Sequence, residues 1–246
     1  MVLHSAPHSP IICAIDTVSA DRAMHLAESV SPYIGALKLG LEYFVAHGAR
    51  GVHAFEKLGI PIFLDLKFHD IPNTVAKAIE ATAGINTFMM TVHTSGGRAM
   101  LQAAIDASMR VAEKTGKCRP YIIGVTTLTS MDQDDLMMTG VRDHVHDHVL
   151  RLADLAQSAH LDGVVCSSYE IEMLRQHACG DFLLVVPGVR PPGSDAGDQK
   201  RVMTPIEAQR RGADYLVIGR PITQAPDPAA AAQAIYHSII SAHHQP

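Results

Sequence analysis

The chain has 246 residues, of which 47% are hydrophobic, and it carries a formal net charge of −5 from 20 basic and 25 acidic side chains. This acidic balance argues against a general nucleic-acid-binding surface, so positive charge for an anionic ligand must be local. The length suits one large domain or two small ones, and single α/β barrels commonly have this size. There is no apolar run long enough to predict a membrane span.

The cysteines and the first residues indicate a reducing compartment. Cys13, Cys118, Cys166 and Cys179 form no C-x-x-C pair, and two of them lie in apolar, strand-like runs. We therefore expect free thiols without disulfides. The first ten residues lack the basic-then-apolar pattern of a signal peptide, so a cytoplasmic location is expected.

Short apolar runs alternate with segments of helical periodicity along the whole chain. Eight strands, each followed by a helix, predict a (β/α)8 barrel of the TIM type, formed as a single domain over residues 1–246. A doubly wound open sheet is the alternative architecture. The predicted strands are Ile11–Ile15, Ala36–Leu39, Ile62–Leu66, Thr87–Val92, Tyr121–Thr126, Gly163–Cys166, Phe182–Val186 and Tyr215–Ile218, and the predicted helices cover 20–31, 41–50, 73–83, 97–115, 145–160, 168–178, 204–212 and 227–242.

Polar residues follow the predicted strands at one end. Because the carboxyl ends of barrel strands meet at one rim, where barrel active sites are built, we expect these residues to lie together. In strand order they are Asp16, Lys38, Asp65 with Lys67, His93, Thr126 to Thr129, Ser167, Arg190, and Gly219 with Arg220.

The most informative segment is Phe63–Thr74, where an apolar strand leads into the spacing D-x-K-x-x-D. Side chains alternate along a strand, so Asp65 and Lys67 are expected on the same side. Charges of both signs at the end of an apolar strand are costly unless they are paired, and they are more often functional than structural. With Lys38 and Asp70 they predict an alternating array of ammonium and carboxylate groups. A structural ion-pair network and, for Asp70, a helix cap are the alternatives.

Two segments rich in glycine and arginine predict an anion site. Pro187–Arg190 ends the seventh strand and Val217–Arg220 ends the eighth, and the loops after these strands are the usual phosphate site of such barrels. Glycine lets the backbone approach the anion, and arginine supplies a planar fork of donors. The long polar stretch from Pro191 to Gln199 is expected to close over the ligand as a lid.

The D-x-K-x-x-D segment resembles the active-site motif of the orotidine 5'-phosphate decarboxylase family, and further matches run from Asp16 to Arg220. The resemblance implies a carboxy-lyase without cofactor or metal that converts orotidine 5'-phosphate to UMP and CO2, the last step of de novo pyrimidine biosynthesis. It also implies a homodimer with shared active sites. Its partners would be a small-molecule substrate and a second copy of the chain, and neither a nucleic acid nor a membrane.

The resemblance further implies roles for individual residues. Lys67 would protonate the carbanion at ring carbon 6, with Asp65, Asp70 and Lys38 as the other catalytic residues. The ribose hydroxyls would be bound by Asp16 and Lys38, and the pyrimidine by Thr129. The phosphate and base would be bound by Arg190, Gln199, Gly219 and Arg220. The implied substrate-binding residues also include Asp65, together with Asp70, Ile71 and Thr74, which would reach into the site of the partner subunit.

The chemistry of decarboxylation explains the need for such an array. Loss of CO2 from orotate leaves electron density on carbon 6, in a vinylic position with no adjacent carbonyl sink. An ammonium beside that carbon stabilises the developing carbanion and then protonates it, while neighbouring carboxylates keep the ammonium charged and fixed. A carboxylate near the substrate carboxylate would also disfavour the ground state.

Three other functions compete with this interpretation. Metal-dependent sugar-phosphate decarboxylases and aldolases of the same superfamily share D-x-K-x-x-D, but they carry an acidic metal ligand where this chain has Lys38, a cation that opposes Mg²⁺ binding. A Schiff-base aldolase needs a neutral amine, which the carboxylates flanking Lys67 disfavour. A non-catalytic nucleotide-binding barrel has no evident use for four buried charges.

Two histidine features invite a functional interpretation that the sequence does not require. The run Asp143–His148 resembles a zinc motif only superficially, because one spacer residue is missing, so a position at the surface is expected. His93, at the end of the fourth strand, lines the pocket or packs against its neighbours.

Overall fold

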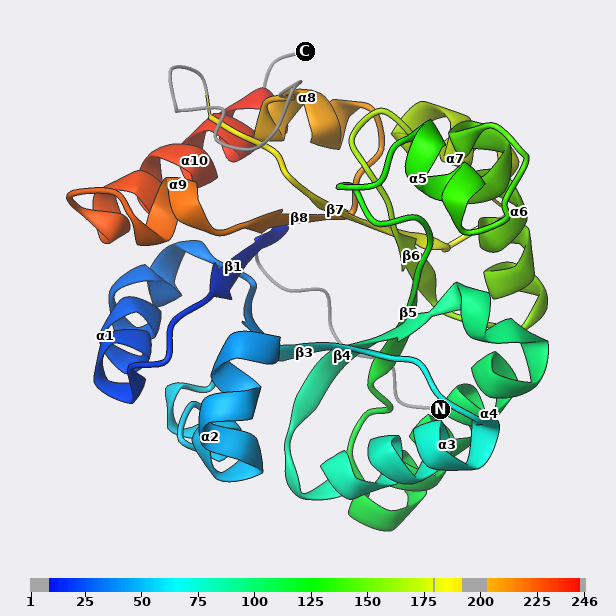
Figure 1. The fold of residues 1–246 in the computed structure, drawn as a ribbon. Helices are drawn as coiled ribbons and strands as arrows, with labels where there is room; N and C mark the ends of the chain where they lie inside the picture. Colours follow the sequence, from blue (N-terminus) through cyan, green and yellow to red (C-terminus); the bar gives the residue numbers. More distant parts are fainter. Residues whose placement is uncertain (1–8, 179, 192–202, 244–246) are drawn as a thin grey trace.

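A computed structural model describes residues 9–178, 180–191 and 203–243. Within these residues, eight parallel strands close into one barrel in which β1 pairs with both β2 and β8 (Figure 1). The prediction of a (β/α)8 barrel is therefore confirmed, and the open-sheet alternative is wrong. The strands are β1 (Ile11–Ile15), β2 (Ala36–Gly40), β3 (Ile62–Phe68), β4 (Thr87–His93), β5 (Tyr121–Val125), β6 (Gly163–Val165), β7 (Leu183–Pro187) and β8 (Tyr215–Ile218).

Helices follow the strands and form an outer layer around the barrel (Figure 1). Each predicted helix is present: α4 has the predicted bounds, and the others differ at one or both ends. Two short helices, α5 and α9, lie outside the predicted elements. Short 3-10 turns occupy Ser31–Tyr33, Glu56–Leu58, Thr82–Gly84 and Thr94–Gly96. The helices are α1 (Ala20–Val30), α2 (Leu41–His53), α3 (Pro72–Ala81), α4 (Gly97–Thr115), α5 (Gln133–Met138), α6 (Val145–Ser158), α7 (Ile171–His177), α8 (Pro205–Arg210), α9 (Arg220–Thr223) and α10 (Pro228–His243).

Local sequence signals explain where several helices begin. The hydroxyl of Ser19 accepts a hydrogen bond from the backbone N–H of Arg22 and caps α1. Thr204 and Glu207 cap α8 reciprocally, each side chain bonding to the backbone of the other residue. Helix α3 begins at Pro72, whose fixed φ suits the first helical position.

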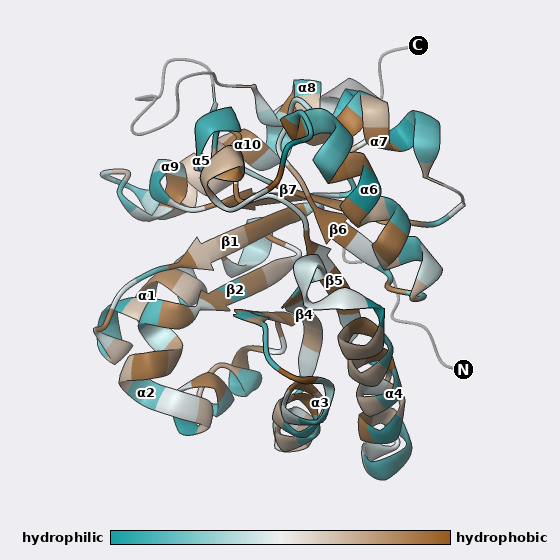
Figure 2. Ribbon diagram, turned by 45° about the vertical axis from the view of Figure 1, so that its right-hand side comes forward, coloured by the Kyte–Doolittle hydropathy of each residue, from teal (hydrophilic) through white to brown (hydrophobic). Residues whose placement is uncertain are grey.

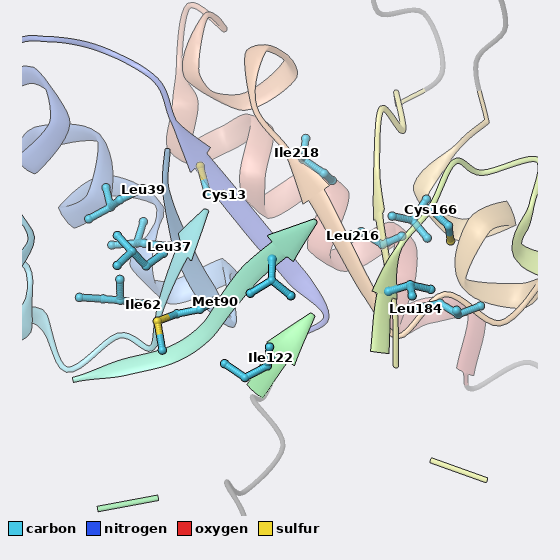
Figure 3. Packing of buried hydrophobic residues seen from close by; sticks show 14 of the residues in the cluster. Cys13, Leu37, Leu39, Ile62, Met90, Ile122, Cys166, Leu184, Leu216 and Ile218 are labelled. Atoms are coloured by element: carbon cyan, nitrogen blue, oxygen red, sulfur yellow. The ribbon is translucent and has the colours of Figure 1, made fainter. Parts of the chain in front are cut away.

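Apolar side chains fill both sides of the strands. One set packs between the strands and the helices and includes Leu37, Ile62, Met90 and Ile218 (Figure 3). Because the strands are buried on both faces over most of their length, they are hydrophobic at most positions, whereas the helices mix apolar and polar residues (Figure 2). The second set fills the interior of the barrel with Ile12, Ala14, Ala36, Phe63, Phe88, Met89, Ile123, Val185, Tyr215 and Val217.

The interior of the barrel changes from apolar to polar at the carboxyl ends of the strands. Side chains two residues apart on a strand point to the same side. The residue two positions after an interior residue therefore also points into the barrel. On the first four strands the apolar layer formed by Ala14, Ala36, Phe63 and Met89 is followed by Asp16, Lys38, Asp65 and Thr91. The apolar core therefore supports a polar layer at the rim.

In the part of the chain that the structure describes, no helix is both long and apolar enough to cross a membrane.

Candidate active site

The structure brings four of the predicted charged residues together at the carboxyl ends of β1, β2 and β3. The Nζ atom of Lys67 lies 2.9 Å from each carboxylate oxygen of Asp65. The Nζ atom of Lys38 lies 3.5 Å from Oδ2 of Asp65 and 3.4 Å from Oδ1 of Asp16. Asp16, Lys38, Asp65 and Lys67 therefore form a row of alternating charge, which we call the charged array.

Asp65 is the buried centre of the charged array. The side chains of Asp65 and Lys38 are each 11% exposed, whereas those of Lys67 and Asp16 are 31% and 54% exposed. Burial by itself raises the pKa of Asp65, but the charges of Lys38 and Lys67 and hydrogen bonds from Lys67 and Thr91 outweigh it and lower the pKa below its usual value. Asp65 is therefore ionised at neutral pH and holds the ammonium of Lys67.

Lys67 reaches Asp65 through an irregular stretch of β3. Its φ is +51°, in the left-handed region that residues with a side chain rarely adopt. The pairing of β3 with β4 also shifts register between Leu64 and Phe68. The predicted contact between Asp65 and Lys67 is present, but regular alternation along a strand that ends at Leu66 is the wrong reason for it.

Two residues that the sequence analysis did not select support the charged array. The hydroxyl of Thr91 accepts a hydrogen bond from the backbone N–H of Lys67 and donates one to Oδ1 of Asp65, each over 2.9 Å. A Cβ atom at Gly40 would lie 3.0 Å from Nζ of Lys38, so this glycine leaves the space that the ammonium occupies. A threonine inside an apolar strand and a glycine at a strand end are too common for the sequence alone to reveal these roles.

The end of the motif lies at the surface of the chain. Oδ1 of Asp70 accepts a hydrogen bond from the backbone N–H of Ile71 over 2.7 Å. The N-cap of α3 is Ile71, and no side chain caps this helix, so the interpretation of Asp70 as a helix cap is wrong. Asp70 and Thr74 are exposed, and the side chain of Ile71 is 66% exposed. Among the described residues, no ion pair joins Asp70 to Lys38 or Lys67.

The predicted phosphate residues lie at the ends of β7 and β8. A Cβ atom at Gly219 would lie 3.9 Å from Oδ2 of Asp16, so this strand end is next to the charged array. Arg220 is exposed and begins α9, and Arg190 is buried after β7. Of the lid expected from Pro191 to Gln199, the structure describes Pro191 alone, and Gln199 lies outside the described residues.

A cavity of about 640 Å³ opens at the carboxyl ends of β5, β6 and β7. Thr129, the predicted pyrimidine contact, lines this cavity together with Thr127, Ser167, Glu170 and Pro187. Glu170 is buried, its carboxylate accepts a hydrogen bond from the backbone N–H of Ser167 over 2.8 Å, and burial raises its pKa. The cavity offers room for a planar ring near the end of β7, which is followed by Arg190.

The structure locates both histidine features, His93 beside His69 and the run from Asp143 to His148 at the start of α6. The ring of His93 packs on that of His69 with centroids 5.2 Å apart, and burial, followed by the nearby charges of His69 and Lys67, lowers its pKa. His93 is therefore neutral at neutral pH. The run from Asp143 to His148 spans the start of α6, and its residues are exposed or half-buried, with Asp143 paired to Arg151. In the described ranges, no group of three or more histidine, cysteine, aspartate and glutamate side chains is arranged to hold a metal ion.

Comparisons with known proteins relate the chain to one family. The sequence profile of the "Orotidine 5'-phosphate decarboxylase / HUMPS family" matches residues 9–235. A curated protein from Paramagnetospirillum magneticum, named orotidine 5'-phosphate decarboxylase, is 51% identical over 227 residues, which cover 92% of this chain and 97% of that protein. A protein of the same name from Moorella thermoacetica is 52% identical over 231 residues, covering 93% of this chain and 91% of that protein.

A solved structure agrees with these sequence relatives. The crystal structure of orotidine 5'-phosphate decarboxylase from Lactobacillus acidophilus matches with a TM-score of 0.84 and 35% sequence identity, over 94% of this chain and 99% of that one. The fold, the position of the charged array and the sequence relatives point to the same conclusion. The chain belongs to the orotidine 5'-phosphate decarboxylase / HUMPS family.

Proposed function

We propose that this chain decarboxylates orotidine 5'-phosphate to UMP and CO2, the last step of de novo pyrimidine biosynthesis, as a carboxy-lyase without a cofactor. The observation that carries the proposal is the ammonium of Lys67, held 2.9 Å from both oxygens of an ionised Asp65 at the rim of the barrel. The name of the relatives that are about half identical supports the same reaction.

In this mechanism Lys67 supplies the proton that replaces the lost carboxylate. The bond between carbon 6 and the carboxylate carbon breaks, CO2 leaves, and the electron pair stays on carbon 6. The ammonium stabilises this charge and donates a proton to it, and the neutral amine regains a proton from water, which its 31% exposure allows. Asp65, which also pairs with Lys38, fixes the ammonium, and no redox step or co-reactant is needed.

The rest of the substrate would lie along the rim next to Lys67. Asp16 and Lys38 bind the ribose hydroxyls in this proposal, and Thr129 contacts the pyrimidine from the cavity over β5 to β7. The phosphate is assigned to Gly219, Arg220 and Arg190, with Gln199 added on the resemblance alone. The short separation between Gly219 and Asp16 supports adjacent sites for phosphate and ribose.

The proposal includes a homodimer with shared sites. Asp70, Ile71 and Thr74 of each chain would enter the site of the partner subunit and complete the catalytic array there. The exposure of all three residues supports this, because an apolar side chain such as Ile71 beside a carboxylate at the surface suits contact with a second chain.

We also place the reaction in the cytoplasm. Cys13, Cys118 and Cys166 are free thiols in the described part of the chain, as expected in a reducing compartment. Burial raises the pKa of the Cys13 thiol to about 12, so this side chain acts as a small apolar core residue.

The direct test of the proposed function is the conversion of orotidine 5'-phosphate to UMP, followed by the loss of substrate absorbance. We expect the same rate before and after exhaustive treatment with EDTA, because the charged array supplies the electrostatic stabilisation. If the chain were instead a metal-dependent sugar-phosphate enzyme, EDTA would abolish its activity. Lys38, at 3.5 Å from Asp65, would repel Mg²⁺ at that carboxylate. Activity that disappears with EDTA and returns with Mg²⁺ would support that alternative.

Removing the Arg220 guanidinium is expected to weaken both substrate affinity and turnover. Arg220→Ala deletes a cation that the proposal places on the phosphate, and phosphate binding helps to position the ring over Lys67. The loss should be roughly 2–5 kcal/mol of transition-state stabilisation, measured from kcat/KM. Arg50→Ala, which removes an exposed arginine in the last turn of α2, is the matched control and should behave as wild type. Unchanged kinetics for Arg220→Ala would remove this residue from the phosphate site.

A further inference from the structure

We propose that Thr91 is a positioning residue for the decarboxylation, because its hydroxyl ties the backbone of Lys67 to the carboxylate of Asp65. This inference rests on the proposed function and extends it to a residue on β4 that touches neither the substrate nor the transferred proton. Thr91 is fully buried, and both of its hydrogen bonds are 2.9 Å long.

The direction of both hydrogen bonds is fixed by chemistry. A backbone N–H can only donate, so the Thr91 oxygen accepts from Lys67. An ionised carboxylate can only accept, so the Thr91 hydroxyl donates its single proton to Oδ1 of Asp65. One hydroxyl serves both partners at once. A side chain without a hydroxyl would leave the Lys67 N–H without this acceptor and would remove one of the two donors on Oδ1 of Asp65.

The bond to Lys67 occurs where β3 departs from a regular strand. Leu64 of β3 pairs with Met90 of β4, and the next pair is Phe68 with Val92. More residues of β3 than of β4 therefore lie between these two pairs. Lys67 lies in this stretch at a φ of +51°. Its N–H is bonded to the side chain of Thr91 on the neighbouring strand. The hydroxyl therefore holds in place a backbone conformation that is unfavourable for lysine.

The two bonds close a ring of contacts around the proton donor. Thr91 holds the backbone of Lys67 and the carboxylate of Asp65, and that carboxylate binds the ammonium of Lys67 through both oxygens. Both ends of the lysine side chain are thus fixed relative to β4. Because a small displacement of a reacting group can cost a large factor in rate, this ring sets how well the ammonium is placed over carbon 6.

Two substitutions separate the hydroxyl from the rest of the side chain. Thr91→Val keeps the branched shape and removes the hydroxyl, whereas Thr91→Ser keeps the hydroxyl and removes a methyl group. We expect kcat for orotidine 5'-phosphate to fall on the order of 10- to 100-fold in Thr91→Val with KM nearly unchanged, since the ribose and phosphate contacts remain. Thr91→Ser should retain kcat to within a few fold of wild type.

The matched control is Thr82→Val, the same change at another buried threonine. The Thr82 hydroxyl donates to the backbone carbonyl of Ile79 over 2.7 Å at the end of α3. This variant should lose stability on heating and keep its kcat. Should Thr91→Val fail to fold, Thr91→Cys replaces the hydroxyl with a weak thiol donor, and its kcat should also fall while that of Thr91→Ser does not.

The outcomes distinguish this inference from the proposed function. A wild-type chain that does not decarboxylate orotidine 5'-phosphate would refute the proposed function itself. An active wild type together with a folded Thr91→Val or Thr91→Cys protein of unchanged kcat would refute only the role of Thr91. Equal losses of kcat in the valine and serine variants would also overturn it, because packing would then be the cause.

Discussion

Replacing Lys67 with alanine is expected to reduce turnover of orotidine 5'-phosphate by at least ~10³-fold, because the change removes both the charge that stabilises the carbanion and the proton that quenches it. Lys67 lies at the rim and 31% of its side chain is exposed, so its loss leaves the core intact. The measurement is single-turnover kinetics at saturating enzyme, together with a thermal unfolding curve.

A matched control separates this effect from a general loss of positive charge. Lys77→Ala removes an exposed lysine on α3 that pairs with Glu80 over 2.7 Å, and it should leave turnover unchanged. Binding of UMP to Lys67→Ala should persist, since the ribose and phosphate contacts remain. A folded Lys67→Ala protein with turnover near that of wild type would refute Lys67 as the proton donor.

Mixing two inactive variants is expected to restore activity if each site is shared between subunits. Lys67→Ala and Asp70→Ala each disable every site of their own homodimers. In a mixed dimer, one site contains both changes and the other contains neither. Random exchange makes about half of the dimers mixed, so the mixture should recover roughly a quarter of the wild-type activity.

The chain offers a sharp control for the complementation experiment. Lys38 and Lys67 both contact Asp65 within one chain, so they belong to the same site. A mixture of Lys38→Ala with Lys67→Ala places one change in each site of the mixed dimer and should recover nothing. Subunit exchange is checked with differently tagged chains. If exchange occurs and the mixture with Asp70→Ala stays inactive, Asp70 serves its own subunit.

The barrel was predictable because its signal is repeated eight times along the chain. Each strand is apolar on both faces, and each is followed by a segment of helical periodicity, so errors at single boundaries do not change the architecture. The two helices that were missed, α5 and α9, have six and four residues. Such lengths are too short for periodicity, although Asp132 and Asp135 form a capping box at the start of α5.

The positions of the charged array were predictable because a closed barrel brings strand ends together. Asp16, Lys38 and Asp65 each follow an apolar interior residue by two positions, and the closed sheet makes them neighbours across β1 to β3. The neighbourhood of these side chains depends only on which segments are strands. The predicted ends of several strands differ from the observed ends by one or two residues, which does not change it.

The backbone at Lys67 was not predictable from local sequence. Nothing in the segment around it indicates a positive φ, because lysine has no preference for that region, and the register shift depends on how β3 meets β4. The hydrogen bond from Lys67 to Thr91 joins residues 24 positions apart. A contact of this kind depends on tertiary structure, and for the same reason the role of Thr91 could not be predicted from the sequence.

The proposed role of Lys67 as the proton donor at carbon 6 can be tested in the reverse direction. By microscopic reversibility, a residue that protonates the carbanion must also remove the proton from carbon 6 of UMP. UMP incubated with the wild-type chain in D2O is therefore expected to exchange the proton on carbon 6 for deuterium, as followed by proton NMR. The Lys67→Ala chain should bind UMP without catalysing this exchange. Exchange at the wild-type rate in Lys67→Ala, or an active wild type that catalyses none, would contradict the mechanism.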